Sequence, residues 1–172
     1  MKRFCIAALA AMIGLAAMAP ASHAVGLMAS WWNIDESNED GFGFGLRSKV
    51  QVARVAAIDT RASWIKFGDP DTNVFPIEAT GILQLGMVYG GLGLGYYIFD
   101  AKDVDLDNSF GWYVVAGIEV AVGKFGVFGE LKWTKLSTDI DGVDPDLGDV
   151  PTELEADGMG VNIGVMFGVP GR

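Results

Sequence analysis

The sequence of 172 residues has only one cysteine and one histidine, and both lie close to its start. Residues 1–24 begin with basic residues, continue as an apolar run and end in small residues. This order predicts a secretory signal peptide that is cleaved after Ala24. Cys5 and His23 both fall within it, so residues 25–172 have neither a thiol nor an imidazole. That absence excludes disulfides, thiolate nucleophiles and imidazole bases. The length of this segment suits one domain.

Positive charge and long apolar runs are also scarce. The chain has 12 Lys and Arg residues against 22 Asp and Glu residues, and its formal net charge is −10. A surface of this sign repels a phosphate backbone, so we expect no nucleic-acid partner. After residue 24, no segment approaches the roughly 20 unbroken apolar residues of a membrane-spanning helix. Glycine, β-branched and aromatic residues dominate instead, which predicts an all-β domain.

The segment GFGFGLRSKVQV at 41–52 shows the pattern that replaces a helical period. Its even positions are mostly apolar, such as Phe42 and Phe44, whereas its odd positions are glycine, polar or charged, such as Arg47 and Lys49. Because side chains alternate between the two faces of a strand, one face is apolar and the other is small or charged. Eight runs of this kind predict strands, at 25–33, 41–51, 55–67, 74–85, 87–99, 110–122, 125–136 and 158–167.

The connections between these runs differ sharply in length. Three are tight, and they lie at 52–54, 85–86 and 123–124. Four are longer and polar, and they lie at 34–40, 68–73, 100–109 and 137–157. Short turns on one rim and long loops on the other are typical of outer-membrane barrels, whose tilted strands need about 9–11 residues to cross. We therefore predict an eight-stranded antiparallel up-and-down transmembrane β-barrel over residues 25–172, with both termini on the periplasmic side.

Charged residues divide between the loops and the strands. The four long loops hold 18 of the 22 acidic residues. The other four acids share the polar strand faces with four bases, and the whole set is Arg47, Lys49, Asp59, Arg61, Glu78, Glu119, Glu130 and Lys132. In a soluble, lipocalin-like barrel these faces would point outward. In a membrane barrel they point inward, and equal numbers of each sign would fill and close the narrow lumen as pairs.

Aromatic residues favour the membrane barrel. Of the 18 aromatic residues after residue 24, 14 lie within four positions of a long loop. Aromatic rings concentrate at membrane–water interfaces and form girdles around barrels. The expected girdle contains Trp31, Trp32, Phe42, Phe44, Trp64, Phe67, Phe75, Tyr96, Tyr97, Phe99, Phe110, Trp112, Tyr113 and Trp133.

Three stretches carry a resemblance to a known family. PIEATGILQLGMVYGGLGLGYYIFD, FGWY and GMGVNIGVMF are similar to strands of the small outer-membrane β-barrel class, which is typified by OmpX and the OmpA transmembrane domain. The chain thus resembles "outer membrane protein beta-barrel domain" sequences over nearly all of residues 25–172, in pattern rather than in a diagnostic motif. Members of this class usually end on an aromatic residue that the insertion machinery reads, whereas here GVPGR follows Phe167.

Two acidic loops resemble calcium-binding loops in their spacing. Hard cations prefer several converging oxygens, which alternating carboxylates can supply. Neither loop completes the pattern, because Asn108 replaces the expected glycine and Val114 and Val150 replace the expected glutamates. We interpret both as solvated acidic loops and keep weak Ca²⁺ or Mg²⁺ binding as the alternative; no other cofactor is expected. The candidate ligands are Asp103, Asp105, Asp107, Asp139, Asp141 and Asp144.

These observations predict a monomeric, non-enzymatic protein of a Gram-negative outer membrane. Barrel enzymes of the class that the chain resembles generally rely on a histidine beside a serine or carboxylate. We expect a structural or surface-interacting role, with the acidic loops as the contact region for an extracellular ligand. The alternative is a narrow, porin-like channel for small solutes. The expected partners are outer-membrane lipid and the insertion machinery.

Overall fold

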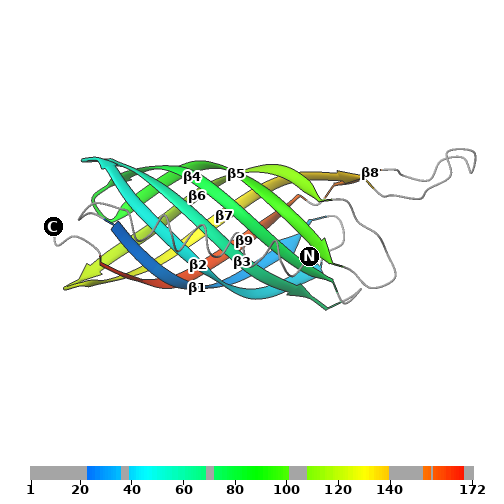
Figure 1. Cartoon of the computed structure of the whole chain (residues 1–172), viewed down its shortest axis with the longest axis horizontal. Coiled ribbons are helices and arrows are strands. Elements are labelled where there is room, and N and C mark those ends of the chain that lie inside the picture. Colours follow the sequence, from blue (N-terminus) through cyan, green and yellow to red (C-terminus); the bar gives the residue numbers. More distant parts are fainter. Residues whose placement is uncertain are drawn as a thin grey trace, which may run out of the picture.

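The computed structural model describes residues 23–35, 39–68, 72–100, 108–139, 153–155 and 157–168. All regular structure in these ranges is β, and Figure 1 shows the strands running obliquely around a common axis. No helix in the described part is long and apolar enough to cross a membrane. The strands are β1 (His23–Ile34), β2 (Glu39–Ala53), β3 (Ala56–Phe67), β4 (Asn73–Leu85), β5 (Val88–Asp100), β6 (Ser109–Val122), β7 (Phe125–Asp139), β8 (Glu153–Glu155) and β9 (Gly158–Phe167).

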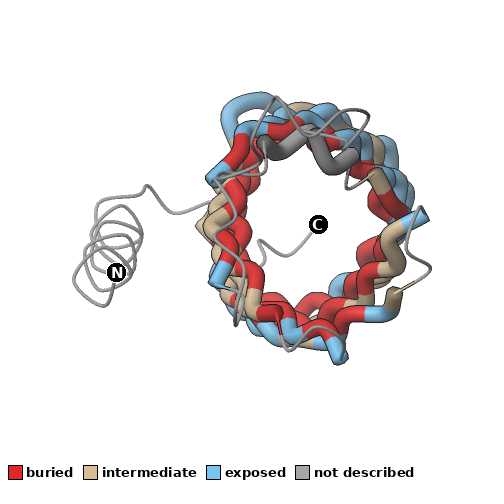
Figure 2. Tube along the Cα trace, turned by 90° about the vertical axis from the view of Figure 1, so that its right-hand side faces the viewer, coloured by how far each residue is buried: buried red, intermediate tan, exposed pale blue. Residues whose placement is uncertain are grey.

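The sheet closes on itself. Each strand from β1 to β7 pairs antiparallel with the next along the chain. Strand β9 lies between β7 and β1 and pairs antiparallel with both. The end-on view in Figure 2 shows the resulting ring of strands. The predicted eight-stranded antiparallel barrel is therefore confirmed, with β8 outside the ring.

The predicted strands match the observed ones within three residues at every end. The largest difference is in the segment 137–157, which the sequence predicts to be a loop throughout. There β7 continues to Asp139, and Ser137 pairs with Glu155 of β8. Where a strand extends past the barrel rim, its backbone N–H and C=O groups have no neighbouring barrel strand to bond. Here the returning segment β8 provides the hydrogen-bond partners. Strand β1 begins at His23, and the predicted cleavage after Ala24 stays a prediction.

Two of the three tight turns at one end of the barrel rely on glycine. Gly86 joins β4 to β5 with φ of 65°, and Gly123 joins β6 to β7 with φ of 63°. A Cβ atom disfavours this left-handed region, so glycine is the residue that the turns require. All the short connections lie on one rim of the barrel, which we call the turn end. We call the opposite rim the loop end.

The two faces of the wall have opposite polarity. Phe42 and Phe44 are 64% and 63% exposed on the outside of β2, whereas Arg47 on the same strand is 1% exposed and lies inside. Figure 2 shows buried and exposed residues alternating along the chain around the whole ring. The glycine-rich, charged faces thus line the lumen and the apolar faces cover the outside, as the membrane-barrel interpretation requires.

One gap interrupts the β3–β4 ladder. Ala62 pairs with Ile77, and pairing resumes only at Ile65 and Val74. Pro76 lies opposite this gap, and proline has no N–H to donate across the ladder. Its other neighbour, Tyr97 of β5, remains in register. The wall is therefore less tightly bonded between β3 and β4 near the loop end than elsewhere.

Candidate functional site

The centre of the lumen holds two arginines and two acids in contact. The Arg47 Nε donates to Asp59 Oδ2 at 2.6 Å, and the Arg47 Nη2 lies 2.5 Å from the same oxygen. The Arg61 guanidinium binds both oxygens of the Glu130 carboxylate, with Nη2 to Oε2 at 3.1 Å. Arg61 also reaches Asp59 at 3.2 Å, which joins the two pairs into one cluster. Bidentate pairs of this kind are the strongest carboxylate contacts that arginine makes.

Strand register explains why two arginines come together. Arg47 of β2 lies directly opposite Arg61 of β3, an arrangement that repels when no acid is near. Asp59 precedes Arg61 on the same face of β3 and neutralises both guanidinium groups. Glu130 reaches the cluster from β7 across the lumen, and its Oε2 lies 3.7 Å from Arg47 Nη1. The closed barrel, rather than adjacent strand pairing alone, completes the charge balance.

Two smaller pairs flank this central cluster. Toward the turn end, Lys49 Nζ donates to Glu119 Oε2 at 2.8 Å and to Gln84 Oε1 at 2.7 Å. Toward the loop end, Lys132 Nζ donates to Glu78 Oε1 at 2.7 Å. All eight charged residues singled out from the sequence are at most 5% exposed, and each contacts a residue of opposite charge.

Tyrosine side chains also fill the lumen and donate hydrogen bonds to its carboxylates, a role that the sequence reasoning missed. Tyr89 donates its hydroxyl to Glu130 at 2.6 Å, and Tyr97 donates to Glu78 at 2.9 Å. Room for the rings comes from glycines at neighbouring inward positions: a Cβ at Gly93 would overlap the ring of Tyr113. The alternation could have revealed this role, because these tyrosines occupy the same faces as the lumen glycines and charges.

An apolar cluster lies inside the barrel at its loop end. The Trp32 ring packs 5.8 Å from the Phe67 ring and 5.7 Å from the Tyr97 ring, measured between centroids. We call this set the loop-end cluster, and its buried members are Trp32, Ile65, Phe67, Val74, Tyr97, Phe99 and Leu136. Since its members come from five strands, the cluster spans the mouth of the barrel above the charges.

This cluster corrects the predicted girdle. Five of the fourteen predicted girdle residues are buried inside the barrel instead: Trp32, Phe67, Tyr97, Phe99 and Tyr113. Closeness to a long loop sets the height of a residue along the barrel, but only its parity within the strand sets the face. Phe110 and Trp112, which have the outward parity, are 78% and 40% exposed as expected of a girdle.

The candidate metal ligands are not tested by the structure. Asp103, Asp105, Asp107, Asp141 and Asp144 lie outside the described residues. Asp139 has a described backbone at the end of β7, but its side chain is not described. Within the described part of the chain, no group of three potential ligand residues converges on a common point.

Comparisons with known proteins agree with this architecture. Among solved structures, the barrel is similar to Neisserial surface protein A (NspA), with a TM-score of 0.57 and 14% identity over 84% of this chain and 94% of that one. It is also similar to OprG from Pseudomonas aeruginosa, with a TM-score of 0.54 and 14% identity over 87% of this chain and 96% of that one. At these identities the likeness concerns the fold alone. No curated protein matches the sequence significantly.

The family model described as "Outer membrane protein beta-barrel domain" matches residues 5–168. That match spans nearly the whole chain and agrees with the closed barrel and its apolar outer face. The predicted resemblance and outer-membrane location are thereby confirmed: the chain belongs to the outer membrane protein beta-barrel domain family.

Proposed function

We propose that this protein is a closed, non-enzymatic barrel with a structural or surface-interacting role in the outer membrane. The observation that carries the proposal is the filled lumen. Arg61 is fully buried in the centre, where it binds Glu130 and Asp59. An eight-stranded barrel leaves room only for side chains, so side chains that are paired across it obstruct the passage of solutes.

Two layers support closure. The charge layer binds β2 and β3 to β7 through Arg47, Arg61 and Glu130. The loop-end cluster lies above it and presents packed apolar rings at the mouth. A hydrated ion would have to separate buried ion pairs and then pass an apolar constriction, and both steps are unfavourable.

The lumen carboxylates also support a non-enzymatic role. A general base or nucleophile must be within reach of a substrate. Here Glu78 and Glu119 bind lysines, and Glu130 binds Arg61 and the Tyr89 hydroxyl. Pairing with buried bases is sufficient to explain why these carboxylates lie in the lumen, so no catalytic role is needed to account for them.

Planar-bilayer recording tests the closed lumen. We expect the refolded protein, with insertion checked by heat-modifiable gel migration, to give no stable single-channel steps. Stable steps of uniform size would instead favour the narrow channel for small solutes. The double variant Trp32→Ala, Phe67→Ala is a useful comparison, because opening the loop-end cluster should leave the charge layer as the remaining barrier.

Surface interaction is the second part of the proposal. The segments 34–40, 68–73, 100–109 and 137–157 at the loop end hold 18 of the 22 acidic residues, so they would present a negative surface outside the cell. Replacing the acids of residues 140–150 by Asn tests this without shortening the chain. If this variant weakens the binding of an extracellular ligand to the cell surface or lowers envelope integrity, the result supports a contact role. Unchanged heat-modifiable gel migration would show that the barrel itself still folds. Unchanged behaviour in both assays would leave only membrane stabilisation by the barrel.

A further inference from the structure

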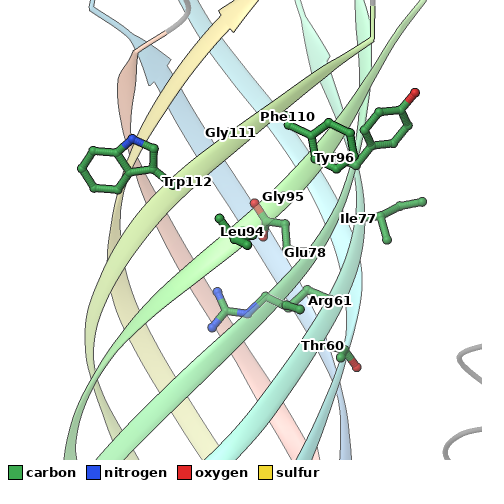
Figure 3. Close-up of a pocket in the computed structure, with 11 residues that line it drawn as sticks. Thr60, Arg61, Ile77, Glu78, Leu94, Gly95, Tyr96, Phe110, Gly111 and Trp112 are labelled. Atoms are coloured by element: carbon green, nitrogen blue, oxygen red, sulfur yellow. The ribbon is translucent and has the colours of Figure 1, made fainter.

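The outer wall of the barrel is hollowed over β3, β4, β5 and β6. Figure 3 shows the residues around this depression, with Tyr96 and Phe110 together at one end and Thr60 toward the other. The depression has a volume of about 600 Å³, and its lining is almost wholly apolar. A second depression of about 650 Å³ adjoins it and shares Ala79, Leu94 and Trp112 with it. We call the two together the wall groove.

Small residues at outward positions produce the wall groove. Thr60 of β3 lies opposite Ala79 of β4, and Ala79 lies opposite Leu94 of β5. Two positions along β4, Gly81 also faces outward and carries no side chain. Many outward positions elsewhere hold large apolar residues, such as Leu27 at 55% and Leu131 at 55% exposure. The floor is therefore low where Thr60, Ala79 and Gly81 meet.

Large side chains border this low floor. Leu94 of β5, which is 69% exposed, and its paired neighbour Trp112 of β6 border the floor on the same side. The Tyr96 and Phe110 rings lie 4.8 Å apart between centroids and close the end nearest the loops. The groove thus runs along the wall from an aromatic cap near the outer interface toward the middle of the barrel.

We propose that the wall groove binds one acyl chain of an outer-leaflet lipid. The groove is continuous with the apolar outer face that places the barrel in the membrane, so lipid chains already surround it. No hydrophobic gain distinguishes the groove from the rest of the wall, because lipid is apolar everywhere; selectivity comes from van der Waals contacts on several sides. This inference rests on the membrane location and is independent of the closed-lumen function.

The shape of the groove favours a lipid chain over a second barrel. A flexible chain can follow the narrow depression over Thr60 and Ala79, beside the Leu94 side chain. The wall of another barrel is convex and stiff, and the exposed Phe110 at the rim, 78% accessible, would hold it away from the floor. A second copy therefore leaves the groove unfilled.

Quenching of Trp112 by brominated lipid tests the proposal in the full-length barrel held in micelles of a bile-salt detergent, which has no acyl chain to compete for the groove. One variant keeps Trp112 as its only tryptophan, and a matched variant keeps Trp64. Both tryptophans face outward three residues from the loop end of their strands, but only Trp112 lines the groove. With phospholipid carrying brominated acyl chains added to these micelles as the probe, we expect half-maximal quenching of Trp112 at about tenfold lower mole fraction than of Trp64, the difference that roughly ten good carbon contacts produce.

Filling the groove supplies the decisive control. Ala79→Phe should abolish the stronger quenching of Trp112 relative to Trp64. Ala29→Phe adds the same bulk to an exposed position on β1, and it should leave this difference in quenching unchanged. Equal quenching of Trp112 and Trp64, or an advantage that survives Ala79→Phe, would overturn the proposal. It would also be overturned if Ala79→Phe converted a dimer to a monomer by mass photometry, because the occupant would then be a second copy. Bilayer conductance is not involved, so this outcome is separate from that of the closed-lumen test.

Discussion

Glu130 and Leu131 are neighbours on β7, yet they lie in opposite environments. Glu130 is 3% exposed inside the barrel, where Arg61, Tyr89 and Asn162 contact it. Leu131 is 55% exposed on the outside. The inner position depends on named partners, whereas the outer position needs only an apolar side chain that suits lipid. The two faces of one strand should therefore respond differently to substitution.

The largest effect is expected inside. Glu130→Leu leaves two arginines with one fewer acid and should lower the free energy of unfolding by about 3–5 kcal/mol, as for other broken buried ion pairs. Urea unfolding of the barrel in lipid vesicles, followed by tryptophan fluorescence, measures it. Glu130→Gln keeps the side-chain volume and loses only the charge. Its free energy of unfolding should therefore lie between those of the wild type and Glu130→Leu.

The next effect is expected from charge on the outer face. Leu131→Arg places a charge against lipid and should lower the free energy of unfolding by about 2–4 kcal/mol if this position lies near the bilayer midplane. The same urea titration measures it, with Leu131→Ile as the volume-matched control. An Arg variant as stable as the Ile control would show that this face contacts water.

A smaller effect is expected where glycine makes room for a lumen ring. Gly93→Val forces its side chain against Tyr113 and should destabilise the barrel by about 1–3 kcal/mol, as overpacking does. Gly90→Val on the same strand is the control, because a Cβ there meets its nearest neighbour at an ordinary distance of 3.6 Å. Equal losses at the two glycines would mean that strand propensity, not the lumen ring, determines the cost.

The smallest effect is expected in the loops. Asp146→Asn in the segment 137–157, where the sequence predicts a solvated acidic loop, should change the free energy of unfolding by less than about 0.5 kcal/mol. Comparing its urea midpoint with that of Glu130→Leu tests the division between barrel and loops. A loss comparable to that at Glu130 would contradict this division.

Alternation made most of the fold predictable. A period of two needs no tertiary information, so it located the strands and the inward position of residues such as Arg47. Cross-lumen contacts were not predictable in this way. Register puts Lys49 opposite Asp59, yet Lys49 binds Glu119 on the far side of the barrel, because the lumen is narrow enough for side chains to meet across it.

The aromatic residues show a second limit. Trp31 and Trp32 differ by only one position in their distance from a loop, and that distance could not separate them. Their faces differ because successive side chains alternate, and only Trp32 joins the loop-end cluster. Counting parity within each strand from its small or polar residues, such as Ser30 on β1, would have separated lumen rings from girdle rings.

Spin-label accessibility at two adjacent positions of β9 tests the polarity of the wall most directly. Ile163 is 58% exposed on the outside and Asn162 is 4% exposed inside. In reconstituted vesicles, a label at Ile163→Cys should be relaxed by oxygen from the hydrocarbon, and one at Asn162→Cys should be immobilised and shielded from oxygen. Relaxation of the Ile163 label by a water-soluble reagent, together with oxygen access at Asn162, would contradict the barrel described here.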